Sequence, residues 1–241
     1  MLEQLKNFFT RKAAPVDSST QTTRRSTFDQ ALRTYPAHVP PHRGLGPDIT
    51  AEQAQANLDW FKLTLPTRLA TLRDLCARTG LTLSETPVNS VDEAIDLTAR
   101  LIEWTRACWP DKPYLSEHKD RHYWAMSART GDDAIFSVVL DVATLLGQII
   151  MDGRKEWRWG LDMARSSLGH QPSLTARREM LMSPLLGQQR HALLKDMEAL
   201  VLSRYLTPND FSFRDPLEFD SWVEYVRDGY TGREFDFYQG A

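Results

Sequence analysis

The longest apolar run in the chain covers residues 134–151 and is interrupted by only a few polar side chains. These recur at intervals of four, three and four positions: Ser137, Asp141, Thr144 and Gln148. Such spacing places them in one line along a helix whose remaining surface is apolar. A membrane span needs about 20 apolar residues, and a carboxylate in the middle of one is costly. The pattern therefore predicts a buried helix, over about residues 133–152, at the centre of a globular fold.

After this run the polar and apolar residues begin to alternate. Asp152-Gly153 marks the end of the helix, because glycine readily adopts the left-handed conformation of a helix C-terminus. Residues 156–162 place apolar side chains on one face and charged ones on the other: Trp157, Trp159 and Leu161 against Glu156, Arg158 and Asp162. Alternation is typical of a strand with one buried face. We expect the aromatic face to pack against the central helix.

Helical periodicity predicts further amphipathic helices around this centre. Thr50 with Gln53, and Ser90 with Glu93, have the spacing of capping boxes ahead of apolar-periodic segments. Pro66 interrupts the first of these segments, so it either kinks one helix or begins a second. The predicted helices cover residues 51–65, 66–79, 91–109, 188–205 and 220–228.

Short apolar stretches between these helices predict a small sheet. We expect a strand at residues 121–127, and a strand or turn at 180–186 after a polar loop that covers 163–183. The predicted fold class is α+β and mostly helical. In it, a buried central helix (about 133–152) is followed by a short strand and packed by amphipathic helices and a small sheet.

The first 48 residues differ in pattern from the rest of the chain. Residues 2–10 have the spacing of a short amphipathic helix, whereas residues 13–26 lack large apolar groups and predict a flexible linker. Four prolines and two glycines in residues 36–48 predict an extended arm. The expected organisation is an N-terminal short helix with a flexible Pro-rich arm (1–48), then a single globular α+β domain (49–241).

Net charge, cysteine content and the N-terminal residues indicate the kind of partner and the compartment of the protein. The formal net charge of −3 is too close to neutral to indicate a nucleic-acid partner. Both cysteines, Cys76 and Cys108, lie in predicted helices, which suits reduced thiols in a reducing compartment. The N-terminal residues lack the features of a secretory signal. We therefore expect a cytoplasmic protein of a bacterium or similar cell.

Few residues indicate a specific chemistry. No nucleophile elbow, phosphate-binding loop or dinucleotide fingerprint occurs in the sequence, and no cofactor is predicted. Asp141 has two interpretations: a ligand-contacting or acid–base group in a cleft, or a buried carboxylate satisfied by a backbone amide or an arginine. The second is favoured.

His118 and His122 are the one candidate pair for a metal. Side chains four residues apart on a helix can chelate a metal ion. However, Lys119 stands where the zinc-protease pattern requires Glu. A solvated face with partly packed aromatic neighbours is the favoured interpretation, so no metal site is predicted.

The region from Asn209 onward is rich in acidic and aromatic residues. Such a tail either packs back onto the domain or, where exposed, contacts another protein, because aromatic residues dominate binding hot spots. The candidate binding residues combine polar groups of the central helix and strand with groups of this tail: Asp141, Gln148, Arg158, Trp222, Tyr225 and Asp228.

One stretch resembles a known group of proteins. An apolar helix with Asp141, a Leu-Leu-Gly sequence ending at Gly147, a polar turn and a strand with Trp157 and Trp159 follow in that order. This layout, over about residues 134–187, resembles bacterial immunity-type proteins encoded beside polymorphic or contact-delivered toxins. The resemblance implies a cytoplasmic α+β protein that binds and blocks a toxin or effector, and it transfers no functional position.

Three functions are therefore considered. The first is a protein-binding module of the immunity type that neutralises a bacterial toxin or effector. The second is an enzyme with a cleft lined by Asp141, His118, His122 and Arg158. The third is a membrane-peripheral or secretion accessory protein, which makes a weak contact with a membrane surface through residues 2–12.

Overall fold

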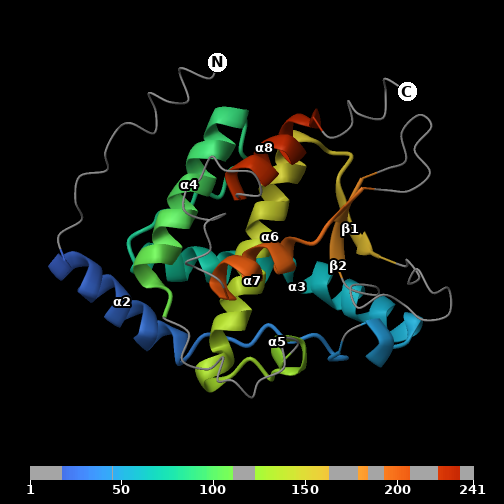
Figure 1. Ribbon diagram of the computed structural model, residues 1–241, viewed down its shortest axis with the longest axis horizontal. Coiled ribbons are helices and arrows are strands. Elements are labelled where there is room, and N and C mark those ends of the chain that lie inside the picture. The colour runs from blue at the N-terminus through green and yellow to red at the C-terminus, as the bar shows by residue number, and fades with distance from the viewer. Residues whose placement is uncertain are drawn as a thin grey trace.

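The protein folds as helices packed around one central helix, with a small sheet at one side (Figure 1). The computed structural model describes residues 18–44, 46–110, 123–162, 179–183, 193–206 and 222–233. The helices in these ranges are α2 (Ser18–Leu32), α3 (Ala51–Arg78), α4 (Val91–Cys108), α5 (Tyr123–Met126), α6 (Ile135–Gly153), α7 (Met197–Leu206) and α8 (Trp222–Thr231). Two 3-10 turns, η1 (Gly46–Asp48) and η2 (Gly131–Ala134), precede α3 and α6. The α+β, mostly helical prediction is confirmed.

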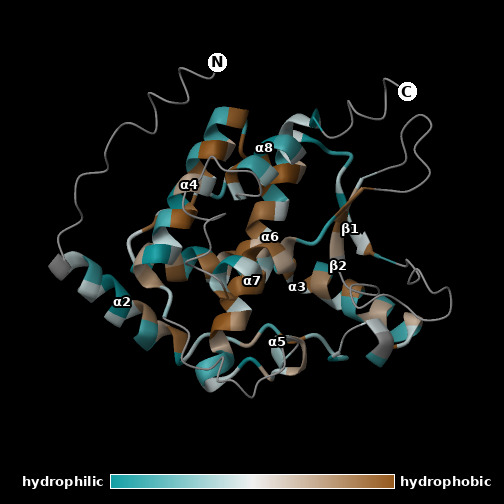
Figure 2. Cartoon of the chain, in the orientation of Figure 1, coloured by the Kyte–Doolittle hydropathy of each residue, from teal (hydrophilic) through white to brown (hydrophobic). Residues whose placement is uncertain are grey.

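The central helix is α6, as its apolar pattern predicts. It is the yellow helix in the middle of Figure 1, and it packs against α3, α4, α7 and α8. Its ribbon is largely brown, the hydrophobic colour, in Figure 2. In the described part of the chain, Gly131–Gly153 is the one helix long and apolar enough to cross a membrane, but 83% of its most apolar window is buried inside the protein. Burial in the core accounts for its hydropathy.

The sheet contains β1 (Arg158–Leu161), β2 (Glu179–Met182) and β3 (Leu194–Lys195), in that order and antiparallel. Trp157 and Trp159 are buried. Trp157 donates to the Gly229 carbonyl of α8 at 3.0 Å, whereas Trp159 packs on α6 as expected. The contact is so close that a Cβ at Gly147 would overlap the Trp159 ring. Asp162 departs from the prediction, because it is buried instead of sharing the exposed side with Arg158. The strand ends at Leu161, so the alternation stops before Asp162.

Helix α3 settles the question raised by Pro66. The chain forms one continuous helix through the proline, capped by the predicted box between Thr50 and Gln53. Apolar residues on both sides of the proline, including Phe61 and Leu69, face the same core. Pro66 itself is exposed. Packing of one continuous apolar face therefore outweighs the hydrogen bond that the proline removes.

The N-terminal region is more ordered than its composition predicts. The flexible linker proposed for residues 13–26 is wrong for residues 18–26, which belong to α2. This helix is held by tertiary packing, since Phe28 is fully buried and its ring meets Trp104 of α4 edge-on at 5.7 Å. Phe28, Ala31 and Leu32 thus belong to the same hydrophobic core as the helices that follow residue 48. Residues 2–12 lie outside the described ranges.

Other short elements also differ from the pattern. The strand expected at 121–127 is wrong where the structure describes it, because Tyr123–Met126 forms a helical turn. The side chains of Tyr123 and Ser127 both donate hydrogen bonds to Asp133, at 2.5 and 2.8 Å, and fold this segment over the start of α6. The helix expected over 188–205 begins at Met197, after strand β3. β2 and α8 lie where the sequence predicts a strand or turn and a helix.

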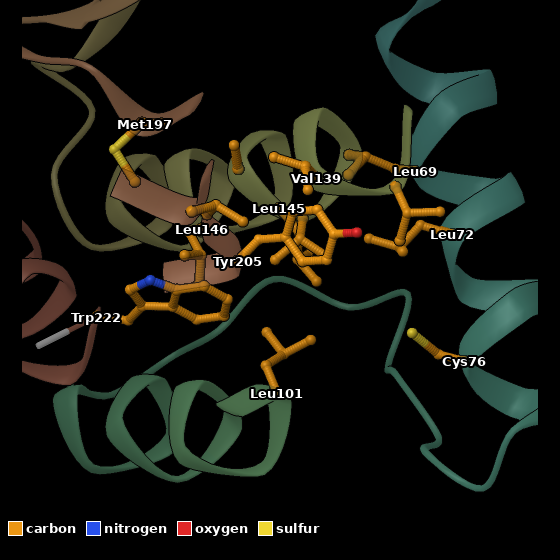
Figure 3. Packing of buried hydrophobic residues seen from close by; sticks show 14 of the residues in the cluster. Leu69, Leu72, Cys76, Leu101, Val139, Leu145, Leu146, Met197, Tyr205 and Trp222 are labelled. Carbon is orange, nitrogen blue, oxygen red and sulfur yellow. The ribbon is translucent and has the colours of Figure 1, made fainter. Parts of the chain in front are cut away.

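The core joins all these helices in one cluster. Figure 3 shows Leu101 of α4, Tyr205 of α7 and Trp222 of α8 gathered beside apolar residues of α6. Trp222 has no exposed surface. Large aromatic side chains from four different helices therefore close the space around α6: Phe28, Trp104, Tyr205 and Trp222.

Candidate functional site

Asp141 lies at the middle of α6 and has no exposed surface. Its carboxylate accepts four hydrogen bonds. Arg68 of α3 donates to Oδ1 from Nε at 3.0 Å and to Oδ2 from Nη2. Tyr35 donates its hydroxyl to Oδ2 at 2.6 Å, and His38 Nδ1 lies 2.6 Å from Oδ1. A carboxylate has about four lone-pair positions, so the group is fully satisfied. We call these four residues the Asp141 cluster.

The chain builds the cluster from three elements. The polar line of α6 faces the inner face of α3, on which Arg68 is the buried cation. The guanidinium also stacks over the Tyr35 ring, with 5.3 Å from its central carbon to the ring centroid, and donates to the Pro36 carbonyl at 2.8 Å. A buried carboxylate without a partner would destabilise the fold by several kcal/mol. The cluster is thus the structural solution predicted for Asp141.

His38 is the cluster's most constrained member. Its backbone N–H donates to Ser137 Oγ at 2.9 Å, and its ring stacks on Phe61 with centroids 6.1 Å apart. Its Nε2 is buried and has no hydrogen-bond partner. Burial lowers the pKa of His38 below 6.5, although the hydrogen bond and charge of Asp141 act in the opposite direction. The ring is therefore neutral, with Nδ1–H donating to Asp141.

Residues 35–44, the strap, cross the protein between α2 and α3 as the blue coil beside α5 in Figure 1. Side chains, and not another strand, satisfy the strap's backbone. The Asn57 amide accepts from the His42 N–H at 2.9 Å and donates to the His42 carbonyl at 2.8 Å. Arg43 donates to the Met126 carbonyl at 3.1 Å. The extended arm predicted from prolines and glycines is extended, but it is fastened to the core.

A cavity of about 30 Å³ lies under the strap. Its walls come from the strap and from α3, α5, α6 and α7: Pro40, His42, Gly44, Ile49, Asn57, Trp60, Phe61, Trp124, Ala125, Arg129, Leu140 and Glu198. The Arg129 guanidinium pairs with the Glu198 carboxylate at 2.9 Å, and the backbone of Arg129 is left-handed, with φ of 53°. A water needs about 10–15 Å³, so the cavity has room for about two waters but not for a metabolite.

The sequence-predicted binding residues do not converge on one site. Gln148 is half-buried and donates to Asp152 at 3.0 Å, and Arg158 is exposed on β1. On α8, the Tyr225 ring lies 3.7 Å from the ammonium of Lys195 of β3, and Asp228 pairs with Arg227 at 3.0 Å. Trp222 is completely buried, which removes it from any surface that a partner reaches.

The described residues support neither a metal site nor a nucleophilic cysteine. His118 and His122 lie outside those residues. Within them, no group of three or more His, Cys, Asp and Glu side chains could hold a metal ion. Cys76 and Cys108 are buried thiols. Burial raises the pKa of both, that of Cys108 to about 11, which makes them poor nucleophiles.

No protein-family model, curated protein or solved structure matches this chain. Function must therefore be argued from its own surface and interior.

The outer face of α3 is the second candidate site. Leu63 is 80% exposed, the most exposed large apolar side chain among the described residues. At helical spacing around it lie one half-buried aromatic and two exposed acids: Trp60, Asp59 and Glu52. Ala56, also exposed, completes what we call the α3 outer face, with Lys62 at its edge. An aliphatic and an aromatic group bordered by charge is the composition of an interface core with a polar rim.

Sequence reasoning misses Tyr35, His38 and Arg68. Only Arg68 could have been found from the sequence. It is a charged residue at a position where the helical spacing of Phe61, Leu69 and Leu72 predicts a buried side chain on the inner face of α3. Tyr35 and His38 lie in a segment without periodicity. Their pairing with Asp141 depends on a contact across more than a hundred residues of sequence.

Proposed function

We propose that this chain is a protein-binding module of the immunity type, which binds a bacterial toxin or effector in the cytoplasm and neutralises it. The observation that supports this most is the α3 outer face, where Leu63 projects 80% exposed from the protein's longest described helix. A leucine in this position gains nothing for the fold, because its side chain stays in water. Burial against a partner would give it a role.

The side chains of the α3 outer face indicate which kind of surface the partner has. Glu52 and Asp59 are exposed beside Leu63 and Trp60, and Lys62 is a cation at the edge of this face. The whole chain carries a formal net charge of −3. Opposite charges across an interface speed association and select the partner. The partner proposed here therefore presents a basic surface with an apolar recess that takes Leu63.

An enzyme is the second candidate, and one observation favours it. His38 and Asp141 are paired through Nδ1 at 2.6 Å, which leaves Nε2 without a partner, as in a histidine held to act as a general base. Against this, neither side chain has any exposed surface. A substrate would reach Nε2 only after the strap had moved. The binding module is therefore the better-supported function.

The binding proposal is tested with the product of the adjacent gene as the candidate partner. We expect a complex whose affinity falls at least about tenfold in Leu63→Arg, because truncation of a hot-spot residue costs 1–2 kcal/mol or more. Surface plasmon resonance measures the affinity. Ala77→Arg is the matched control: it adds the same charge at an exposed position of the same helix, and its affinity should stay within about twofold of the wild type.

Two results would contradict the proposal. One is the absence of a complex with the wild-type chain. The other is equal weakening by Leu63→Arg and Ala77→Arg, which would show that charge alone, and not the α3 outer face, governs binding. Circular dichroism melting of both variants checks that each is folded.

A further inference from the structure

The strap is fastened to the core at several points, and His38 forms two of these contacts from a fully buried position. Its ring meets Asp141, and its backbone N–H meets Ser137. The other described attachments are the Tyr35 hydroxyl on Asp141, the Pro36 carbonyl on Arg68, the His42 backbone on Asn57 and the Arg43 side chain on the Met126 carbonyl. No strand among the described residues pairs with the strap. Its position therefore depends strongly on the state of His38.

The surroundings of His38 suit a neutral ring and not a cation. Arg68 of α3 already balances the single charge of Asp141 on α6 through a two-pronged ion pair. A second cation, Arg129, acts on His38 from the segment after α5, where it pairs with Glu198 of α7. On the strap itself, Tyr35 is an uncharged donor to Asp141, and burial raises the pKa of its hydroxyl far above neutrality. Among the described residues that act on His38, no carboxylate charge is left over for an imidazolium.

Protonation of His38 would add an N–H at Nε2, an atom with no hydrogen-bond partner and no contact with water. A charged donor that is buried without an acceptor is strongly unfavourable. Exposure of the ring to water would relieve this cost, and a lifted strap provides it. Protonation and closure therefore oppose each other.

We propose that the strap is a pH-sensitive latch, closed over the core while His38 is neutral and opened in mildly acidic solution by protonation at Nε2. The small cavity under the strap is bordered by Pro40, His42 and Gly44, so this part of the strap is not fully packed against the core. Opening would expose the Asp141 cluster and the aromatic wall formed by Trp60 and Phe61. The latch does not depend on the proposed function.

Two backbone amides report directly on the latch. The N–H of His38 and the N–H of His42 are protected by strap bonds to Ser137 and Asn57. Hydrogen exchange of the full-length protein, corrected for intrinsic rates, is measured at about pH 7.5 and about pH 5, within the range of histidine titration. We expect protection at both amides to fall measurably at the lower pH, because protonation at Nε2 favours the open strap. Amides in the middle of α6 should keep their protection.

Matched variants separate the latch from general acid destabilisation. In His38→Asn the strap has no titrating ring at this point, so protection at the His42 amide should no longer depend on pH. In His42→Asn, which removes the other strap histidine but keeps its backbone bonds, the wild-type dependence should persist. If His38→Asn fails to fold, the titration of the His38 ring is followed by NMR in the wild type instead. The midpoint of that titration should coincide with the pH at which the strap amides lose protection.

The latch is overturned by any of three results. Strap amides could keep the same protection at both pH values. His38→Asn could lose protection on acidification as the wild type does. The ring of His38 could titrate at a pH where the strap amides do not change.

Discussion

Asp141 shows how a single charged residue can sit inside a core made largely of hydrocarbon. Its four hydrogen bonds come from two elements that are remote in sequence, the strap and α3. Arg68 supplies the opposite charge, and Tyr35 and His38 fill the remaining acceptor positions. A buried ion pair stabilises little relative to an apolar core, but removal of one partner is costly. The cluster therefore fixes where the strap lies more than it adds to stability.

Arg68→Met tests this at the residue scale. The substitution keeps the length of the side chain but leaves the Asp141 carboxylate without its cation, so the free energy of unfolding should fall by about 3–5 kcal/mol. Urea denaturation measures it. In Asp96→Asn, which breaks the exposed pair with Arg100, the loss should be below about 1 kcal/mol. Equal losses of unfolding free energy in the two variants would show that the buried Asp141 cluster stabilises the fold no more than an exposed ion pair does.

The sequence predicts elements better than it predicts contacts between them. The central helix, the Trp-rich strand, the caps at Thr50 and Ser90 and the C-terminal helix all follow from local periodicity. Helix α2 is missed because most of its residues are polar and its stability comes from packing of Phe28 and Ala31. The Asp141 cluster is missed for a related reason, since no local pattern tells which distant residue completes a buried charge.

At the scale of elements, Gly147 of α6 allows a close contact between helix and sheet. The Trp159 ring occupies the place that a Cβ at Gly147 would take. Glycine lowers the intrinsic stability of a helix by about 1 kcal/mol relative to alanine. Its presence here is explained by close packing of β1 on α6, and not by any need for a turn.

Gly147→Ala should therefore destabilise the protein, against the usual effect of this substitution in a helix. We expect a loss of about 1–3 kcal/mol, the cost of overpacking a core, in thermal or urea unfolding. The same substitution made together with Trp159→Val should be neutral or stabilising relative to Trp159→Val alone, because the smaller side chain leaves room for the methyl group. A gain in stability from Gly147→Ala alone would contradict this packing of strand on helix.

At the scale of the whole molecule, the fold divides its polar chemistry between interior and surface. The groups that could form a catalytic centre, Asp141 and His38, lie inside and hold the strap. The side chain that most lacks a structural role, Leu63, lies outside on α3. This division supports binding of another protein over catalysis on a substrate. The two functions differ in the amount of this chain that is needed to inhibit a toxin completely.

The number of equivalents of this chain that inhibit the toxin separates a binding module from an enzyme most directly. Purified toxin, taken as the product of the adjacent gene, is held at a fixed concentration well above the dissociation constant, and its activity is followed as this chain is added. A binding module acts by occupying its partner, so inhibition should rise linearly and end at one equivalent of the chain. Complete inhibition at about a hundredth of an equivalent, increasing with time of incubation, would show turnover and contradict the account.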